Sequence, residues 1–336
     1  MILTRTPFRI SFFGGGTDFP SFYREHGATV LSVTINKYCY IMTRELPPFF
    51  DYKYRIRYTN REETATIAEI KHPVVRAVLE QMNLPYGIEM VHTSDIPAMS
   101  GIGSSSAFTV GFLQGIQALT GRIASKRQLA DRAIDIEQNR LGENVGSQDQ
   151  IAVAFGGLNR IDFQVGGGYA VTPITIPRSR IAALEQRCLL FFTGFTRYSS
   201  DIQKEQIANL KDNTARLLAM KALTGEAFDL LNSDAPLCEF GTLLDRTWQL
   251  KCKLGSQVSN SLIDQAYAAA RRAGASGGKI LGAGGGGFLL VFVEPEFREK
   301  VCAALSPMLR VPFHFESAGS QVTMYSQLSY SEELEE

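Results

Sequence analysis

Two hydrophobic periods alternate along the first half of the chain. Between residues 52 and 58, aromatic or aliphatic side chains alternate with cationic ones, and this two-residue period predicts a half-buried strand. Residues 28–43 are rich in β-branched and aromatic side chains and predict one or two strands, and residues 87–93 predict another. The apolar residues at positions 108, 112, 116 and 119 have helical spacing, and residues 126–141 predict a second helix.

The rest of the chain combines short apolar strands with long helices. We expect strands over residues 156–163, 188–193, 288–293 and 322–325, a glycine-rich turn over 165–172, and helices over 201–223, 240–254 and 259–273. In the helix over 240–254, an i, i+4 stripe is formed by Phe240, Leu244, Trp248 and Cys252. Glycine and proline are frequent over residues 165–187, which places a domain boundary there.

Length and charge narrow the class of protein. At about 150 residues per domain, a chain of 336 residues predicts two domains. A hydrophobic fraction of 45% and a charged fraction of 20% allow a sizeable core. The 34 basic and 34 acidic residues cancel, so bulk charge supports neither a nucleic-acid partner nor an anionic membrane.

Targeting and redox signals favour a cytoplasmic protein. No apolar run approaches the roughly 20 residues that span a bilayer. Residues 1–10 lack the apolar block and the cleavage site of a secretory signal. The five cysteines are scattered without a Cys-x-x-Cys pair, which favours reduced thiols. The four histidines show no metal-ligand spacing, and we expect them to be structural or surface residues.

The central chemical signal is a segment rich in serine and glycine between a predicted strand and a predicted helix. It runs from Pro97 to Ala107 and contains Gly101, Ile102, Gly103, Ser104, Ser105 and Ser106. The glycines permit a tight turn without side chains that would block a phosphate. The N–H groups and the partial positive charge of the following helix stabilise an anion. The segment therefore predicts a phosphate-binding loop, and a serine-capped helix after a flexible loop is its structural alternative.

Two better-known nucleotide motifs do not fit the sequence. No stretch has the Gly-x-x-x-x-Gly-Lys-Ser/Thr spacing of a Walker A loop. The run from Gly282 to Gly287 formally matches the dinucleotide pattern Gly-x-Gly-x-x-Gly. That pattern must open a helix, whereas this run leads into the strand predicted over 288–293. The run instead permits close approach of its backbone to a neighbouring loop or to a ligand.

A further glycine-rich segment near the N-terminus ends in an acid. It runs from Pro7 to Asp18 and includes Gly14, Gly15, Gly16 and Thr17. A carboxylate at Asp18 can accept hydrogen bonds from sugar hydroxyls. A helix-capping or turn aspartate has the same signature, so the segment alone does not decide its role.

Taken in this order, the three segments resemble the GHMP kinase superfamily of galactokinase, homoserine kinase, mevalonate kinase and phosphomevalonate kinase. The resemblance spans Pro7 to Phe288, and its most specific part is the central motif, in which Ile102 replaces the usual leucine. Residues 14–18 stand where many members have Gly-Glu-His-x-Asp. At these residues the chain is similar to one branch of the family, the sugar 1-kinases that act on D-glycero-D-manno-heptose 7-phosphate. L-fucokinase domains are close relatives of that branch.

The resemblance implies an α+β fold of two domains with the active site in the cleft between them. An N-terminal ATP-binding domain would cover residues 1–175 and a C-terminal domain residues 176–336. ATP and Mg²⁺ are the implied cofactors. In the family a loop serine and a distant glutamate hold Mg²⁺, and the matching residues are Ser105 and Glu137. The alternative for this glutamate is a partly exposed helix carboxylate that pairs with Arg140 or Arg132.

The resemblance also assigns the reacting groups. Asp149 matches the family aspartate that faces the acceptor hydroxyl, which it would orient and deprotonate; its structural alternative is a turn residue. Arg9 matches a basic residue near the transferred phosphate, where it would stabilise charge or bind substrate. The residues expected to bind the substrate are Gly16, Thr17, Asp18, Gly285 and Gly286, with Arg197 and Lys204 as candidates for a second phosphate.

The implied activity is transfer of phosphate from ATP to the anomeric hydroxyl of a small-molecule sugar phosphate, D-glycero-D-manno-heptose 7-phosphate. An L-fucokinase or another sugar 1-kinase is the nearest alternative. A non-catalytic sugar or nucleotide sensor is the alternative from another class, against which the joint retention of Ser105, Glu137 and Asp149 argues. A decarboxylase of a phosphorylated mevalonate is disfavoured by residues 14–18. The anomer, the adenine contacts and the choice between a monomer and a homodimer stay open.

Overall fold

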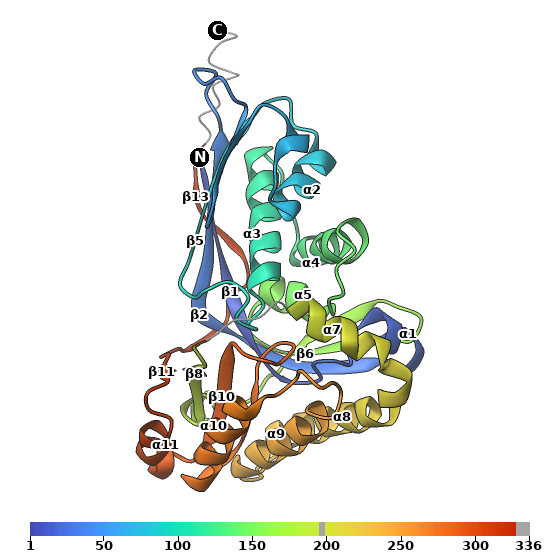
Figure 1. The fold of residues 1–336 in the computed structure, drawn as a ribbon, viewed down its shortest axis with the longest axis vertical. Coiled ribbons are helices and arrows are strands. Elements are labelled where there is room, and N and C mark those ends of the chain that lie inside the picture. The colour runs from blue at the N-terminus through green and yellow to red at the C-terminus, as the bar shows by residue number, and fades with distance from the viewer. Residues whose placement is uncertain (195–198, 327–336) are drawn as a thin grey trace.

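The computed structural model describes residues 1–194 and 199–326, which form two β-sheets with helices packed on them (Figure 1). The larger sheet is built on two long strands, β1 (Ile2–Phe13) and β2 (Ala28–Glu45), which pair antiparallel. The short helix α1 (Pro20–His26) connects them. The N-terminal glycine-rich segment therefore follows the end of β1 directly.

On the side away from β1, three segments pair with β2 in turn. β6 (Leu158–Phe163) pairs with its first residues, β12 (Phe315–Glu316) with its middle and β5 (Ile88–Ser94) with its last residues. The remaining strands of this sheet are β3 (Tyr54–Arg57), β4 (Arg61–Thr64), β7 (Tyr169–Pro173) and β13 (Gln321–Tyr325). Strands from both ends of the described chain thus share one sheet.

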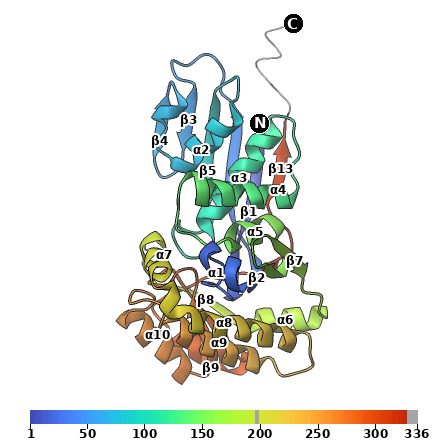
Figure 2. The ribbon, with the colours of Figure 1, turned by 90° about the vertical axis from the view of Figure 1, so that its right-hand side faces the viewer.

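Helices from the middle of the chain cover one face of the larger sheet (Figure 2). α3 (Ser104–Leu119) packs on β1 and β2, and its Gly111 allows a close approach, because a Cβ there would lie 2.7 Å from the Thr6 hydroxyl oxygen. The other helical segments here are α2 (Pro73–Met82), α4 (Lys126–Ile134), α5 (Gln148–Phe155), a 3₁₀ turn (Ile67–Glu69) and a π-helical turn (Asp135–Arg140). The π-helical turn directly continues α4.

The smaller sheet has four antiparallel strands in the order β11 (Leu309–Arg310), β8 (Cys188–Phe192), β10 (Phe288–Val293) and β9 (Ala275–Ile280). All residues of β10 are buried, as its continuous apolar sequence requires. The helical segments in this part of the chain are α6 (Arg178–Gln186), α7 (Ser199–Ala208), α8 (Leu210–Leu231), α9 (Cys238–Lys251), α10 (Ser261–Arg272), α11 (Arg298–Ala304) and a 3₁₀ turn (Pro295–Phe297).

Phe240 of α9 joins the two sheets. Its ring packs edge-on against Phe12 and Phe13 at the end of β1, with ring centroids 5.4 and 5.0 Å apart. It also contacts Phe292 of β10 at 5.5 Å. Aromatic pairs of this kind contribute about 0.5–1.5 kcal/mol each beyond the burial of their surface. The contacts therefore fix the end of β1 against the smaller sheet.

Lys279 of β9 makes a second, polar link at the same place. The residue is buried, and its Nζ donates hydrogen bonds to the carbonyl oxygens of Ser11 (2.9 Å) and Phe12 (3.1 Å). A β-bulge between Ser11 and Phe13 takes Phe12 out of the ladder with β2. Burial, with the neighbouring cations Lys251 and Arg9, lowers the pKa of Lys279 well below its ordinary value.

The predicted α+β class with two domains is confirmed, and three predicted elements differ in detail. The helix predicted over 201–223 is two helices, because Asn209 leaves the helical conformation (φ −93°, ψ 16°). The helix predicted over 126–141 becomes π-helical from Asp135. The turn predicted over 165–172 is occupied by β7 from Tyr169 onward.

Helices α5 and α6 and strand β9 are among the elements that were not predicted, as are α1 and α2. Helices α5 and α6 have 8 and 9 residues, too few to show a clear period. The glycines of β9 meet backbone on both sides: a Cβ at Gly277 would lie 1.8 Å from the Gly241 carbonyl oxygen, and one at Gly278 would lie 2.3 Å from that of Leu290. This strand therefore needs glycine where strand propensity favours branched residues.

The domain boundary after residue 175 stays a prediction. The chain leaves the larger sheet close to this point and enters the smaller sheet with β8, but it returns to the larger sheet with β12 and β13. Among the helices of the described chain, none is both long and apolar enough to cross a bilayer.

Candidate active site

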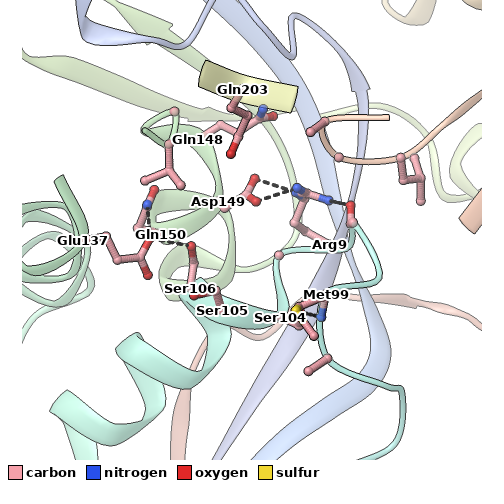
Figure 3. Close-up of a pocket in the computed structure, with 18 of the residues that line it drawn as sticks. Arg9, Met99, Ser104, Ser105, Ser106, Glu137, Gln148, Asp149, Gln150 and Gln203 are labelled. Atoms are coloured by element: carbon pink, nitrogen blue, oxygen red, sulfur yellow. Dashed lines mark hydrogen bonds and ion pairs between the residues drawn. The ribbon is translucent and has the colours of Figure 1, made fainter. Parts of the chain in front are cut away.

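A cavity of about 300 Å³ lies where loops from the two sheets meet. Its wall includes the end of β1, the segment before α3, the start of α5 and the glycine run before β10, with α7 and the end of α9 on another side. Figure 3 shows Arg9, Glu137 and Asp149 around this space together with the serines at the start of α3. Side chains from widely separated segments therefore share one cavity.

Helix α3 presents its N-terminus to the cavity. Gly103 precedes the helix with φ +76°, a conformation that glycine adopts without strain, and the helix begins at Ser104. The Ser104 hydroxyl accepts a hydrogen bond from the N–H of Met99 at 3.1 Å, which closes the turn before the helix. The unpaired N–H groups and the partial positive charge of this helix end suit an anion such as a phosphate.

Two glycine-rich segments touch each other beside this helix end. Gly101 has φ +81°, and a Cβ there would lie 2.5 Å from the Leu281 carbonyl oxygen. Gly282 has φ +70°, and a Cβ there would lie 2.6 Å from the Gly101 Cα. Backbone is packed on backbone, so neither position accepts a side chain. The close approach expected for the glycine run is thus made with the neighbouring loop.

Arg9 and Asp149 form a two-point ion pair in the cavity. Arg9 Nε donates to Asp149 Oδ1 at 2.7 Å, and Arg9 Nη2 donates to Oδ2 at 2.6 Å. Arg9 Nη1 also donates to the Gly101 carbonyl oxygen at 2.7 Å. Two parallel charge-assisted bonds fix both side chains more firmly than one would. Asp149 remains partly open to the cavity, with 25% of its side chain exposed.

Asp18 is a second, buried carboxylate in the same wall. Its oxygens accept hydrogen bonds from the N–H groups of Gly16 (2.9 Å) and Gln148 (3.3 Å). Burial raises the pKa of Asp18, and the negative charge of Asp149 raises it further. Gly146 makes room for it, since a Cβ there would lie 1.9 Å from Asp18 Oδ2.

Glu137 lies on the π-helical turn and is buried in the cavity wall. Its Oε2 accepts hydrogen bonds from the hydroxyl of Ser106 (3.0 Å) and from the side-chain amide of Gln150. Its Oε1 has no hydrogen-bond partner within the described chain. Burial raises the pKa of Glu137 to about 7. The alternative of a helix-surface carboxylate is not what the structure shows, since Arg140 bonds to Asp135 instead.

Comparison with known proteins identifies the family of this chain. Residues 68–157 match the family model described as GHMP kinases N terminal domain, and residues 235–308 match the one described as GHMP kinases C terminal. The D-glycero-alpha-D-manno-heptose 7-phosphate kinase of Campylobacter jejuni is 31% identical over 316 residues, which cover 90% of this chain and 93% of that protein. The chain belongs to the GHMP kinase family. It is an ATP-dependent phosphotransferase, and its relatives identify it as a sugar kinase.

A solved structure and a further relative support the same fold and family. The crystal structure of a D-glycero-D-manno-heptose 1-phosphate kinase from Bacteroides thetaiotaomicron superposes with a TM-score of 0.79 at 24% identity, and the match covers 97% of this chain and 100% of that one. The bifunctional fucokinase/GDP-fucose pyrophosphorylase of Arabidopsis thaliana is 24% identical over 88% of this chain and 30% of its own length. The family resemblance inferred from the three glycine-rich segments is therefore confirmed.

In this GHMP kinase, most of the predicted phosphate loop lines the cavity. The lining residues are Gly101, Gly103, Ser104, Ser105 and Ser106. Ile102 does not line it: the residue is fully buried, and its carbonyl oxygen accepts the N–H of Arg9 at 3.1 Å. Ile102 thus connects the loop to β1. The phosphate-binding role of the loop stays a prediction.

The predicted metal pair is only partly brought together. Glu137 and Ser105 both line the cavity, but the hydroxyl that contacts Glu137 is that of Ser106. Ser105 is exposed at the first turn of α3. Among the described residues, no three His, Cys, Asp or Glu side chains gather around one point. A metal held by Glu137 would therefore draw its remaining ligands from hydroxyls, phosphate and water.

Of the predicted substrate residues, Gly16, Asp18 and Gly286 line the cavity. Thr17 is buried, and its hydroxyl donates to the Gly14 carbonyl oxygen at 2.7 Å. The N–H of Gly285 donates to Val258 at 2.8 Å, and the residue is not part of the wall. Thr17 and Gly285 therefore shape the neighbouring loops.

Of the two predicted cations for a second phosphate, the structure describes only Lys204, and it does not line the cavity. Arg197 lies outside the described residues. Lys204 is exposed on α7, whose contribution to the wall is Gln203 and Gln206. Lys204 precedes Gln206 by two positions, and a two-residue step on a helix turns a side chain to a different face.

The sequence analysis missed one cation and one group of rings that line the cavity. The cation is Lys251, at the end of α9, which is buried although it is a lysine. A signal was present, because Lys251 follows Leu244 by seven and Trp248 by three positions on the apolar face of the helix. A lysine in that row predicts either a snorkelling side chain or a buried charge, and only the structure distinguishes them.

The missed rings are those of Tyr58, His72, His92 and Phe108, which line one end of the cavity. His72 stacks on Phe108 with ring centroids 4.6 Å apart, and His92 meets Phe108 edge-on at 5.2 Å. Burial lowers the pKa of His72 to about 4 and also lowers that of His92. This end of the cavity is therefore aromatic and uncharged near neutral pH.

Proposed function

We propose that this GHMP kinase transfers the γ-phosphoryl group of ATP to the anomeric hydroxyl of D-glycero-D-manno-heptose 7-phosphate and forms the 1,7-bisphosphate. The observation that carries the proposal is the 31% identity, over 90% of the chain, to the Campylobacter jejuni kinase named for this substrate. The product would serve the synthesis of nucleotide-activated heptose for surface polysaccharides.

The cavity supplies an anion-binding end and a carboxylate end for such a transfer. The triphosphate of ATP suits the N-terminus of α3, where N–H groups and serine hydroxyls are available. Asp149 lines the same cavity, is held by Arg9, and would face the acceptor hydroxyl. Asp18 uses backbone N–H groups for two of the roughly four acceptor sites of a carboxylate and can accept sugar hydroxyls with the others.

The proposed step is an in-line transfer. The acceptor oxygen forms a bond to the γ-phosphorus, the bond from that phosphorus to the bridging oxygen breaks, and ADP leaves with the electron pair. Asp149 orients the acceptor hydroxyl and takes its proton. A guanidinium cannot act as a base, so Arg9 holds the carboxylate and stabilises negative charge.

Glu137 and Ser105 would hold Mg²⁺. The unpartnered Oε1 of buried Glu137 is the observation that fits a cation, because a buried oxygen without a partner is costly. Serine and carboxylate oxygens are ligands that Mg²⁺ prefers. When bound, the ion would neutralise charge on the phosphate oxygens of ATP.

The aromatic end of the cavity would bind the adenine ring. Phe108 and His72 offer stacked rings, Tyr58 and His92 complete the group, and Met99 borders it. A flat, uncharged base is stabilised by such faces through stacking and burial of apolar surface. The arrangement would orient the nucleotide with its phosphates toward α3.

A coupled ADP-release assay over a panel of sugars tests the proposal. The panel contains D-glycero-D-manno-heptose 7-phosphate, the free heptose, L-fucose, hexoses and hexose phosphates. We expect kcat/KM to be at least about tenfold higher for the heptose 7-phosphate than for any other member, and ³¹P NMR to show the new phosphate on the anomeric carbon. Preference for L-fucose would support a fucokinase instead. If none of the sugars stimulated ADP release, a sugar kinase of either kind would be contradicted.

A further inference from the structure

Lys251 is a cation buried at the wall of the cavity. Only 2% of its surface is exposed, and it lines the cavity at the end of α9. Its Nζ donates a hydrogen bond to the carbonyl oxygen of Gly282. A lysine ammonium has three N–H donors, so two remain after this bond. Burial of a charge is costly unless the charge is paired, so a cation kept here calls for a partner.

The charges around Lys251 leave it without a carboxylate of its own. Arg9 occupies both oxygens of Asp149. Asp18 accepts backbone N–H groups. No ion pair joins Lys251 to any carboxylate within the described part of the chain. Of the described Lys and Arg residues that line the cavity, which are Arg9 and Lys251, the lysine is therefore the one whose charge is not already neutralised.

The position of Lys251 is set by the two glycine-rich segments. Its acceptor, Gly282, lies directly against Gly101, since a Cβ on Gly282 would be 2.6 Å from the Gly101 Cα. Gly101 in turn accepts a hydrogen bond from Arg9. Lys251 therefore reaches the cavity close to the phosphate loop.

We infer that Lys251 is a catalytic cation that contacts a phosphoryl group in the cavity. The inference rests on the proposed kinase function and adds a residue to it. Lys251 donates its free N–H groups to phosphate oxygens and stabilises negative charge as the acceptor oxygen approaches. A preorganised donor of this kind acts without reorganisation at the moment of reaction. No bond to Lys251 forms or breaks.

Because Lys251 can lose its proton, the pH dependence of kcat/KM tests the inference in solution. Burial and the positive charge of Arg9 together lower the pKa of Lys251 to about 8, against the opposing effect of Asp18, Cys252 and Asp149. Lys279, from β9, is another cation close enough to affect it. The ammonium is present below this pKa and is lost as the pH rises through it. We expect kcat/KM to fall above pH 8 for this reason.

Three variants test the contact. Lys251→Met removes the charge with little change in volume, Lys251→Arg keeps a permanent charge, and Lys253→Met makes the same chemical change at an exposed position two residues away. We expect Lys251→Met to lower kcat about 10²-fold and to weaken ATP binding about tenfold, as loss of a charge-assisted donor does. Lys253→Met should behave as the wild type, and Lys251→Arg should lose the fall of kcat/KM above pH 8.

Two binding measurements distinguish ATP from the sugar phosphate as the source of the phosphoryl group that Lys251 contacts. ATP binding is measured by titration calorimetry without sugar, and KM is measured for the sugar phosphate. Weaker ATP binding assigns the contact to the nucleotide, whereas a higher KM for the sugar phosphate alone assigns it to the acceptor. A Lys251→Met enzyme with kcat, ATP affinity and sugar-phosphate KM all within about threefold of the wild type overturns the inference.

Two measurements keep the inference distinct from stability and from the proposed function. Replacement of a buried charge by an apolar group of similar volume is often neutral or stabilising, so the Tm of Lys251→Met should not fall. A lower Tm together with normal kinetics would mean that Lys251 is only structural. A wild type that phosphorylates no sugar would overturn the proposed function, while the calorimetric comparison of ATP binding would still decide the role of Lys251.

Discussion

Arg9 holds both carboxylate oxygens of Asp149, although the two residues are 140 positions apart in the chain. The pair brings the end of β1 to the start of α5 and orients the carboxylate toward the cavity. A carboxylate held at two points keeps its position when a hydroxyl approaches. The ion pair therefore links two distant segments and also positions the group proposed to receive the proton.

Asp149→Asn should lower kcat by about 10²-fold or more and leave ATP affinity within about threefold of the wild type. Asparagine still accepts a hydrogen bond from Arg9 but is no base. Steady-state kinetics and calorimetric ATP binding check the result. Asp162→Asn is the matched control, since Asp162 pairs with Arg160 on β6 outside the cavity. Near-normal turnover of Asp149→Asn would remove Asp149 from the reaction.

Glu137→Gln should raise the Mg²⁺ concentration needed for half-maximal activity about tenfold or more, because an amide oxygen is a weaker ligand than a carboxylate. A titration of activity with Mg²⁺ at fixed ATP measures this. Glu299→Gln is the control, because Glu299 is exposed on α11 and does not line the cavity. An unchanged titration for Glu137→Gln would contradict a ligand role for this residue.

The contribution of Glu137 to the stability of the metal-free protein should fall as the pH rises from about 4.5 to about 7. The folded pKa of Glu137 is raised above the unfolded value, so the folded state keeps a proton that the unfolded state releases in this window. A difference of about 2.5 units corresponds to about 3 kcal/mol, and Glu137→Gln should not show this loss. Urea unfolding at several pH values with a chelator present measures it. Parallel pH profiles for the two proteins would contradict the shift.

Gly101→Ala should destabilise the protein more than Gly121→Ala. Both glycines have positive φ, +81° and +68°, so both variants carry a strain of about 1–2 kcal/mol. Only at Gly101 does the new Cβ meet backbone, whereas nothing lies within 4 Å of the one at Gly121. We also expect at least an about tenfold lower kcat/KM for ATP in Gly101→Ala, because the two glycine-rich segments must separate. Equal unfolding free energies would disprove the tight contact.

Met99→Ala should raise KM for ATP about fivefold and leave KM for the sugar unchanged. Met99 is 45% exposed and lines the cavity, so its loss removes surface available to a bound base and leaves the core intact. Ile123→Ala is the control, because Ile123 is 99% exposed and does not line the cavity. A change in KM for the sugar alone would place the nucleotide elsewhere.

The elements whose hydrophobic period repeats several times, and the motifs between them, could be predicted from the sequence. Helix α3 has apolar residues at helical spacing over about three turns, and the serine-rich segment marks its start. Helix α5 has only 8 residues, too few for a hydrophobic period to be recognised, although it carries Asp149. The position of Asp149 came from the family resemblance, which compares motifs and does not require the element to be predicted.

The parts that were missed depend on contacts between distant segments. The π-helical turn adds a residue to one turn of the helix that carries Glu137, and hydrophobic periodicity does not encode such an insertion. His72 and His92 meet Phe108 only because strand pairing and helix packing bring three segments together. Lys251 ends an amphipathic helix, where a lysine ordinarily reaches solvent, and its burial follows from the loop that covers it.

The link from Lys279 to the carbonyl oxygens of Ser11 and Phe12 limits how the cleft can open. These bonds lie two and three residues beyond Arg9 on β1, and a sliding motion of the sheets there would leave a buried amine without partners. The junction of β1 and β9 therefore keeps Arg9, and through it Asp149, at a fixed place relative to the smaller sheet.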